Sequence, residues 1–309
     1  MTDNPEILDE ISGIKIEREI CARKITSYAV GGNINILITV KDSNGIPHVL
    51  RALRKADISY LILGAGTNML VSDDGFKGAF VRLNAEFREI HNVSEQTIYA
   101  GGACLISDLI LFLRRNNLGG PLFLSGIPGT IGGAVAMNAG AFGGEISEYL
   151  TYIDVVTSDG EILKLKPSEC EFGYRQSKIK KEKLFVTGVE IAVTPGKKIE
   201  NEVEEYLTRR SKNHLQGSNY AGSVFKNPKG NYAGKLIDDC GLKGLRVGSA
   251  FVSEKHANFI ISDDGGSASD VFDLMKISAT RVFHFYGIKL EPEIQLVGFD
   301  IKWDEIFKL

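Results

Sequence analysis

The sequence predicts an α+β protein, because strand-like and helix-like segments are mixed irregularly along its 309 residues. Residues 33–40 alternate apolar and polar side chains as a half-buried strand does, and residues 60–63 and 97–101 also have strand character. Residues 103–117 have the spacing of an amphipathic helix and end in two arginines. Since strands and helices do not alternate strictly, a doubly wound parallel sheet is disfavoured.

The opening segment predicts a compact βαβ-like unit, in which the strand at 33–40 precedes a short helix around Val49, Leu50 and Leu53. A hairpin is expected at 152–166, because Asp159-Gly160 is a typical hairpin turn. The further elements expected are a strand at 184–193, a polar helix at 198–213 that would connect two domains, a strand at 223–226, a helix at 233–239, a strand at 250–262, a long helix opened by a capping box of Ser267 and Asp270, and a closing strand in LEPEIQLVG.

Composition excludes several classes of protein. With 43% hydrophobic residues the chain can bury a real core, and a net charge of -3 gives no field that would steer it to nucleic acid or to an anionic membrane. The first ten residues are acidic and no run of 18 apolar residues occurs, so neither export nor membrane insertion is expected. The sequence therefore predicts a cytoplasmic location.

Cysteines and histidines give no sign of a metal site. The cysteines are far apart without a CxxC pair, and no HExxH or paired histidine spacing occurs. We therefore expect no metal, and we expect Cys21, Cys104, Cys170 and Cys240 to be reduced core residues.

Glycine-rich segments are the main functional signal. From Asn116 to Gly144 the chain carries no charge, while nine glycines fall between Gly119 and Gly144. Glycine backbones allow close approach of a ligand, and their N–H groups can bind phosphate oxygens without a lysine. The alternative is a glycine-rich turn that packs against a sheet.

Two other glycine segments fail known motifs. In residues 63–73, Met69 stands where a GxGxxG dinucleotide motif needs its third glycine. In residues 230–236, Leu236 replaces the serine or threonine of a P-loop, which excludes that type of ATPase or kinase.

Several polar residues are candidates for chemistry, although each, taken alone, is more often a solvated surface residue. Ser223 lies in AGSVFKNP without the GxSxG pattern of a serine hydrolase. Arg175 in YRQSK offers a fork of donors for a carboxylate or a developing enolate. Pro292 in LEPEI suggests a sheet edge or the rim of an active site. His256 and Asn258 are expected on one face of a strand, which could instead face water.

Taken together, the segments resemble the UDP-N-acetylenolpyruvoylglucosamine reductase family over nearly the whole chain, in the shorter subclass that lacks an inserted tyrosine-bearing loop. Nine segments in one order are far more specific than any one alone. The segments are TSYAVGG (26–32), LGAGTNMLVSD (63–73), AGG (100–102), GIPGTIGGAVAMNAGAFG (126–143), YRQSK (174–178), GSVFKNP (222–228), AGKLID (233–238), KHANFI (255–260) and LEPEI (290–294).

The resemblance implies an FAD-binding fold of two subdomains, similar to the vanillyl-alcohol oxidase type, and a C-terminal α+β substrate-binding domain. The implied boundaries are 1–84 and 85–197 for the FAD-binding subdomains, 198–298 for the substrate-binding domain and 299–309 for a C-terminal tail. The implied function is the NADPH-dependent reduction of UDP-N-acetylglucosamine enolpyruvate to UDP-N-acetylmuramate in peptidoglycan precursor synthesis, with non-covalent FAD. A UDP-sugar is the expected ligand, and no nucleic acid, membrane insertion or obligate protein partner is expected.

The resemblance also assigns residues. It implies Ser223 as the proton donor, Arg175 as the group that holds the enolate, and Glu293 as a second polarising group, with the role of Glu291 left open. The implied substrate-binding residues are Tyr174, Lys226, Asn227, Lys235 and His256. The implied cofactor-binding residues are Gly64, Ala65, Gly66, Thr67, Asn68, Met69, Gly126, Ile127, Pro128, Gly129, Gly132, Gly133, Asn138, Ala139 and Gly140.

Two alternatives remain open from the sequence. Another FAD-linked oxidase or dehydrogenase on the same scaffold would bind flavin but not UDP-sugars. A non-catalytic nucleotide-sugar binding protein would be colourless when purified.

Overall fold

The computed structural model describes residues 8–9, 11–196, 199–212 and 219–308. The chain forms two compact units. The first unit comprises Met1–Arg18, Ile36–Ala65 and Gly78–Arg210, and the second comprises Glu19–Asn35, Gly66–Lys77 and Ser211–Leu309. Helix α5 (Glu200–Ser211) confirms the predicted polar helix, and the last boundary between the units falls within it. The predicted ends of this helix, residues 198 and 213, lie outside the described residues. The domain boundaries implied by the resemblance stay a prediction.

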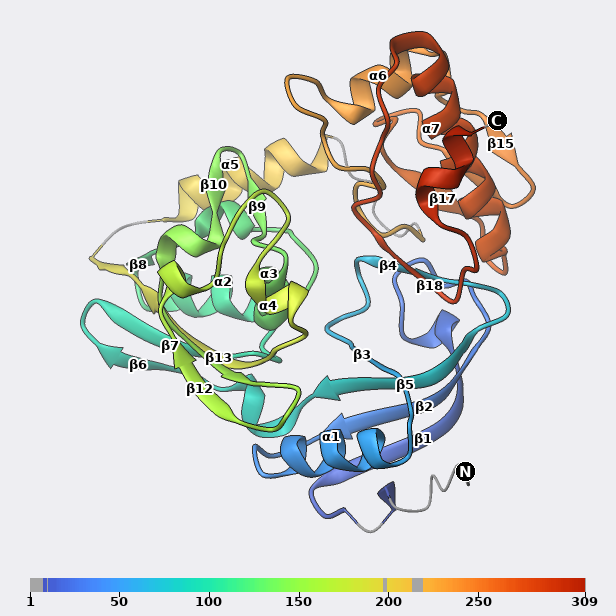
Figure 1. The fold of residues 1–309 in the computed structure, drawn as a ribbon. Coiled ribbons are helices and arrows are strands. Elements are labelled where there is room, and N and C mark those ends of the chain that lie inside the picture. The colour runs from blue at the N-terminus through green and yellow to red at the C-terminus, as the bar shows by residue number, and fades with distance from the viewer. Residues whose placement is uncertain (1–7, 10, 197–198, 213–218, 309) are drawn as a thin grey trace. The chain divides into compact units, whose positions relative to one another are not determined.

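A sheet with the strand order β1-β2-β5-β3 lies largely in the first unit (Figure 1). Helix α1 packs against it, because Val49, Leu50 and Leu53 recur on one helix face and join a buried cluster with Ile38 and Val81 of the strands. The predicted βαβ-like unit therefore forms, except that β5 lies between β2 and β3 and pairs with β3 in parallel. The elements are β1 (Ile14–Cys21), β2 (Asn33–Val40), α1 (Gly45–Lys55), β3 (Tyr60–Ile62) and β5 (Phe76–Leu83).

The other large sheet of the first unit is antiparallel, with the order β12-β11-β13-β7-β6. The predicted hairpin is confirmed, with Gly160 at a positive φ of 85° in its turn. The elements are β6 (Ile90–Ser94), β7 (Thr97–Gly101), α2 (Ile106–Arg115), β8 (Leu118–Gly119), α3 (Ile131–Ala136), β9 (Gly140–Ala141), β10 (Gly144–Glu145), β11 (Leu150–Val156), β12 (Ile162–Leu165), α4 (Lys178–Lys181), β13 (Phe185–Ala192) and β14 (Thr194–Pro195).

Helix α2 starts at Ile106 rather than at the predicted residue 103. The preceding residues form a turn, because the Cys104 N–H donates to Gly101 O and the Ile106 N–H donates to Gly129 O. The start of the helix is thereby joined to the glycine-rich stretch.

The second unit is built around the long helix α7. Ser267 caps its start by accepting the Asp270 N–H, as predicted, but the capping box is only half formed. The Asp270 carboxylate accepts instead from the Ser249 N–H and hydroxyl, at 2.8 and 2.7 Å. The elements are β4 (Met69–Val71), α6 (Ala233–Asp239), β15 (Arg246–Val247), β16 (Ala250–Val252), β17 (Ile260–Ser262), α7 (Ala268–Tyr286) and β18 (Gln295–Val297), which pairs with β4 in parallel.

Two strand predictions in this unit are wrong. Residues 250–262 form two antiparallel strands, because the buried Ser253 hydroxyl accepts the N–H groups of Lys255 and His256 and turns the chain. Residues 223–226 form only an isolated bridge, between Phe225 and Pro292, instead of a regular strand.

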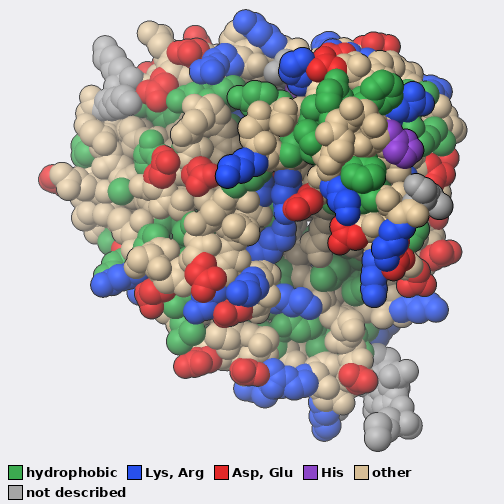
Figure 2. Space-filling view, turned by 45° about the horizontal axis from the view of Figure 1, so that its top comes forward, with side chains coloured by type: hydrophobic (Ala, Val, Ile, Leu, Met, Phe, Trp, Pro, Cys, Tyr) green, Lys and Arg blue, Asp and Glu red, His purple; other side chains and the backbone are tan. Residues whose placement is uncertain are grey.

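None of the described helices is both long and apolar enough to span a membrane. Basic and acidic side chains are interspersed over the face shown in Figure 2. The four cysteines are free, but the prediction that all are core residues is only partly right, because Cys104 and Cys170 are buried whereas Cys21 and Cys240 are half-buried.

Candidate functional site

Three glycine segments that are far apart in the sequence meet in the first unit. A Cβ atom on Gly64 would come within 2.8 Å of Thr130 Oγ1, and the Gly132 N–H donates to Gly102 O at 2.9 Å. Thr130 is also the N-cap of α3, since its hydroxyl accepts the Gly133 N–H at 3.2 Å. The first glycine loop, the buried AGG and the long uncharged stretch therefore pack together in the first unit.

The part of the uncharged stretch directly before Gly126 is held by helix α5. The Arg210 guanidinium donates to Ser125 O at 2.9 Å and to Phe123 O at 3.3 Å. Gly126, exposed and at a positive φ of 77°, follows directly. A side chain there would meet Arg210 and Leu207, so glycine keeps the approach open.

Asn138 connects the glycine-rich stretch to two neighbouring segments and is fully buried. Its amide nitrogen donates to Glu145 Oε2 at 2.6 Å and to Gly173 O at 3.2 Å, while its amide oxygen accepts the Ser147 N–H at 3.3 Å. The Asn138 side chain is therefore bound by the protein itself, and its predicted contact with the cofactor stays a prediction.

Arg175 lies at a tight turn beside the same stretch. Gly173 and Gln176 exchange backbone hydrogen bonds across the turn, and Arg175 takes a positive φ of 57°. Its guanidinium donates to Gly140 O at 3.1 Å and lies over the ring of Tyr174, at 5.1 Å from the centroid. Arg175, Tyr174 and the 138–140 loop are thus neighbours in the first unit.

In the second unit, the segments that carry Ser223 and Glu293 are paired. The Lys226 N–H donates to Glu291 O at 2.9 Å, and the Glu293 N–H donates to Val224 O at 2.8 Å. Pro292 stands between these bonds, at a position where no N–H is required, which explains how a proline fits here.

The 66–69 loop joins this pairing. Asn68 Nδ2 donates to Glu293 O at 3.2 Å, and the Gln295 N–H donates to Asn68 O at 3.0 Å. Met69 is 5% exposed and belongs to strand β4, so packing accounts for its apolar side chain.

The predicted substrate-binding residues of the second unit have different surroundings. Lys226 pairs with Glu291 at 3.0 Å, and the exposed Lys235 pairs with Asp239 at 2.6 Å. The Asn227 side chain accepts the Ala233 N–H at the start of α6.

His256 lies in a tight turn, half-buried and stacked on Phe259, with ring centroids 4.5 Å apart. Burial, with Lys243 as a second cause, lowers the pKa of His256 below its ordinary value. The Asn258 N–H points at His256 Nδ1, so a neutral ring carries its proton on Nε2. The ring can therefore donate from Nε2 at neutral pH.

Sequence and structure comparisons decide the family. Residues 213–297 match the family model "UDP-N-acetylenolpyruvoylglucosamine reductase, C-terminal domain", and residues 34–166 match "FAD binding domain". The chain is 39% identical to UDP-N-acetylenolpyruvoylglucosamine reductase 2 of Symbiobacterium thermophilum over 92% of both chains, and 39% identical to the reductase of Clostridium kluyveri over 96% of both. The chain belongs to the UDP-N-acetylenolpyruvoylglucosamine reductase family. The crystal structure of the reductase from Thermus caldophilus matches with a TM-score of 0.79 and 34% identity, covering 92% of this chain and 99% of that one.

The α+β class, the FAD-binding domain and the C-terminal domain of the reductase family are therefore confirmed. The residues also fit FAD chemically. Gly64, Gly126 and Gly133 of the first unit are exposed and carry no side chain, so a diphosphate could approach the main chain closely there. In the second unit, the hydroxyl of Ser27 is buried without a partner among the described residues, and the Ser27 N–H donates to Gly66 O. A polar group of a cofactor at the 66–69 loop would satisfy that hydroxyl.

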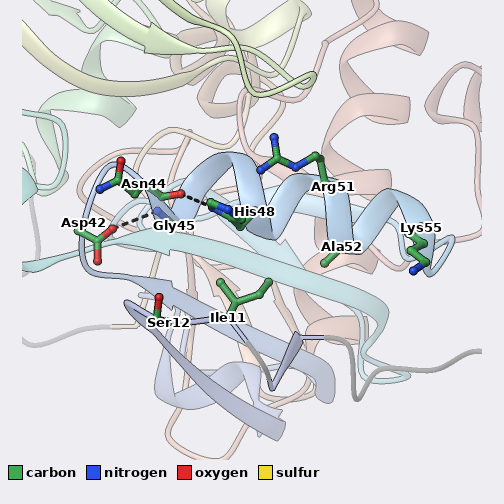
Figure 3. A pocket seen from close by; sticks show the side chains of 9 residues that line it. All are labelled: Ile11, Ser12, Asp42, Asn44, Gly45, His48, Arg51, Ala52 and Lys55. Carbon is green, nitrogen blue, oxygen red and sulfur yellow. Dashed lines mark hydrogen bonds between the residues drawn. The ribbon is translucent and has the colours of Figure 1, made fainter.

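A cavity of about 460 Å³ lies elsewhere in the first unit, along helix α1 (Figure 3). Figure 3 shows His48 turned toward Asn44 and Asp42 toward the Gly45 N–H. No residue that the sequence assigns to the site lines this cavity. Within the described ranges, no group of three or more histidine, cysteine and acidic residues is arranged to hold a metal ion.

Sequence reasoning missed three residues that organise these segments. Thr130 and Arg210 hold the glycine stretch, and Glu145 binds Asn138. Asn258 was expected with His256 on one face of a strand, but both lie in a turn, where the Asn258 side chain binds the main chain of Phe225. Only Thr130 had a local signal, because a threonine directly before a helix is a common N-cap.

Proposed function

We propose that this protein reduces UDP-N-acetylglucosamine enolpyruvate to UDP-N-acetylmuramate, with NADPH as the reductant and FAD as the carrier. The observation that carries the proposal is the pairing of residues 224–226 with residues 291–293 in a member of the reductase family. This pairing brings together the segments of Ser223 and Glu293, which are 70 residues apart in the sequence. A cytoplasmic location and the absence of an obligate protein partner stay predictions of the sequence.

The chemistry requires one hydride and one proton. The glycine segments and the 66–69 loop are the residues proposed to hold FAD, whose chemistry when bound would be hydride transfer from NADPH to the β-carbon of the enol ether. Negative charge then develops at the α-carbon and its carboxylate, where the fixed guanidinium of Arg175 stabilises it. The Ser223 hydroxyl supplies the proton to the α-carbon, and Glu293 polarises the same centre. A serine suffices because a strongly basic carbon lowers the demand on the acidity of the donor.

The proposed roles depend on positioning by the surrounding residues. Arg175 is held by the turn at 173–176 and by Gly140 O. Lys226 and Asn227, next to Ser223, are proposed to contact the UDP-sugar, together with Tyr174, Lys235 and His256. No catalytic role is assigned to Glu291, because its carboxylate already pairs with Lys226.

The test is an anaerobic experiment in two stages. The bound flavin is first reduced with NADPH, and the enolpyruvyl UDP-sugar is then added while the flavin absorbance is followed. Reoxidation with formation of UDP-N-acetylmuramate is expected. A reduced flavin that persists after substrate is added would refute the substrate, and would favour another FAD-linked oxidase on this scaffold. A colourless protein would favour the non-catalytic alternative.

The role of Ser223 can be tested separately. Ser223→Ala should leave flavin reduction by NADPH nearly unchanged and slow reoxidation by about 10²–10⁴-fold, the usual contribution of a general acid. The control is Ser94→Ala, on the exposed edge of the first unit, which should alter neither stage. Equal damage to both stages would remove Ser223 from its proposed role.

A further inference from the structure

The side chain of Asn258 takes the place of a neighbouring strand next to Phe225. Asn258 Oδ1 accepts the Phe225 N–H at 3.0 Å, and Asn258 Nδ2 donates to Phe225 O at 2.8 Å. On its other side, the segment around Phe225 is paired with residues 291–293. Asn258 is 2% exposed, so both bonds are shielded from water.

These bonds extend to the residue before Phe225. The Val224 N–H donates to the main-chain oxygen of Asn258 at 2.9 Å, and Val224 O accepts the Glu293 N–H at 2.8 Å. The Val224 N–H belongs to the peptide unit that joins Val224 to Ser223. The direction of the Ser223 Cα–Cβ bond is therefore set by where Asn258 holds the chain. Gly222, at a positive φ of 73°, gives no comparable restraint on the other side.

Asn258 is itself held rigidly. Its N–H is directed at His256 Nδ1, and the Ser253 hydroxyl fixes the turn by accepting the Lys255 and His256 N–H groups. A primary amide is the side chain that can donate and accept at once toward one residue. Aspartate in its place would keep the bond from the Phe225 N–H but lose the donor to Phe225 O, and leucine would lose both.

We infer that Asn258 is a positioning residue for proton transfer, because its amide holds the main chain at Phe225 and thereby aims the Ser223 hydroxyl. This inference rests on the proposed role of Ser223 and deepens it. The Asn258 amide acts through the main chain of Phe225 and not by contact with cofactor or substrate. Its loss should therefore slow the proton-transfer stage alone.

The experiment measures both stages in Asn258→Asp and Asn258→Leu, with the holoenzyme, NADPH and the enolpyruvyl UDP-sugar, in H₂O and in D₂O. A displacement of about 1 Å can cost about 100-fold in rate, so we expect reoxidation to slow about 10-fold in the aspartate variant and about 100-fold in the leucine variant. Flavin reduction by NADPH and the half-saturating substrate concentration should stay within about twofold. The solvent deuterium effect on reoxidation should rise above the wild-type value, because proton transfer becomes limiting.

Asn116→Asp is the matched control. Its amide also donates to a main-chain oxygen, that of Phe112, at 2.9 Å, but at the exposed end of α2 in the first unit. The control should alter neither stage. Circular dichroism and flavin content show whether each variant is folded. If the leucine variant does not fold, the aspartate variant, which keeps one of the two bonds, provides the test.

The outcomes separate the two proposals. Wild-type protein that fails to reoxidise overturns the proposed function and this inference with it. Wild-type protein that reoxidises, beside Asn258 variants with a normal reoxidation rate, overturns the inference alone. The same holds if both stages slow equally, or if reoxidation slows with an unchanged deuterium effect, since Asn258 would then only support the fold.

Discussion

Replacing Asn138 with alanine should destabilise the first unit by about 2.5–4 kcal/mol. The strongest of its bonds is the 2.6 Å contact to the Glu145 carboxylate, and bonds to charged groups contribute about 1.5–3 kcal/mol. The bonds to Gly173 O and from the Ser147 N–H, at 3.2 and 3.3 Å, are near the upper limit and add about 0.5 kcal/mol each. Alanine also tolerates the positive φ of 43° less well than asparagine.

The free energy of unfolding is measured by urea titration, with circular dichroism as the signal. Asn92→Ala, at an exposed position in β6, is the control and should change it by less than about 0.5 kcal/mol. Asn138→Asp would place a second carboxylate beside Glu145, so the aspartate variant should be less stable than the alanine variant at neutral pH. A loss below about 1 kcal/mol for Asn138→Ala, or an aspartate variant as stable as wild type, would refute this reasoning.

Two further predictions concern single positions. Gly102→Ala should cost about 3 kcal/mol or more, because its Cβ would overlap the Val186 main-chain oxygen. Gly120→Ala should cost less than about 1 kcal/mol, because its Cβ would meet only the ends of two side chains, Leu113 at 3.2 Å and Val193 at 3.7 Å; equal losses in urea titration would contradict this. Burial lowers the pKa of His256 in the folded state. As the pH falls below the ordinary pKa of 6.5, the unfolded chain therefore binds a proton at His256 before the folded chain does. The folded state loses stability below that pH and not above it. His256→Gln cannot bind that proton and should lose less stability than wild type between about pH 7.5 and about pH 5.5, and thermal unfolding curves of equal pH dependence would argue against the assignment.

The sequence predicted those helices and strands whose formation depends on residues close together in the chain. The strand at 33–40, the helix at 233–239 and the cap at Ser267 follow from periodicity and capping, because both act over a few residues. The strand predicted at 250–262 failed because apolar alternation continues through a turn that Ser253 makes with its hydroxyl. Periodicity cannot distinguish one long strand from two short strands on the same core.

The sequence alone determined the α+β class, the uncharged glycine stretch and the ordered set of segments that marks the reductase family. It could not show that Gly64 meets Thr130, that Asn138 is bound by Glu145, or that Asn258 replaces a strand beside Phe225. These contacts join residues 7 to 66 positions apart, and hydrogen bonds between such residues leave no periodic trace in the chain. Only the tertiary structure decides them, because a buried polar group is stable only where folding brings its partner within bonding distance.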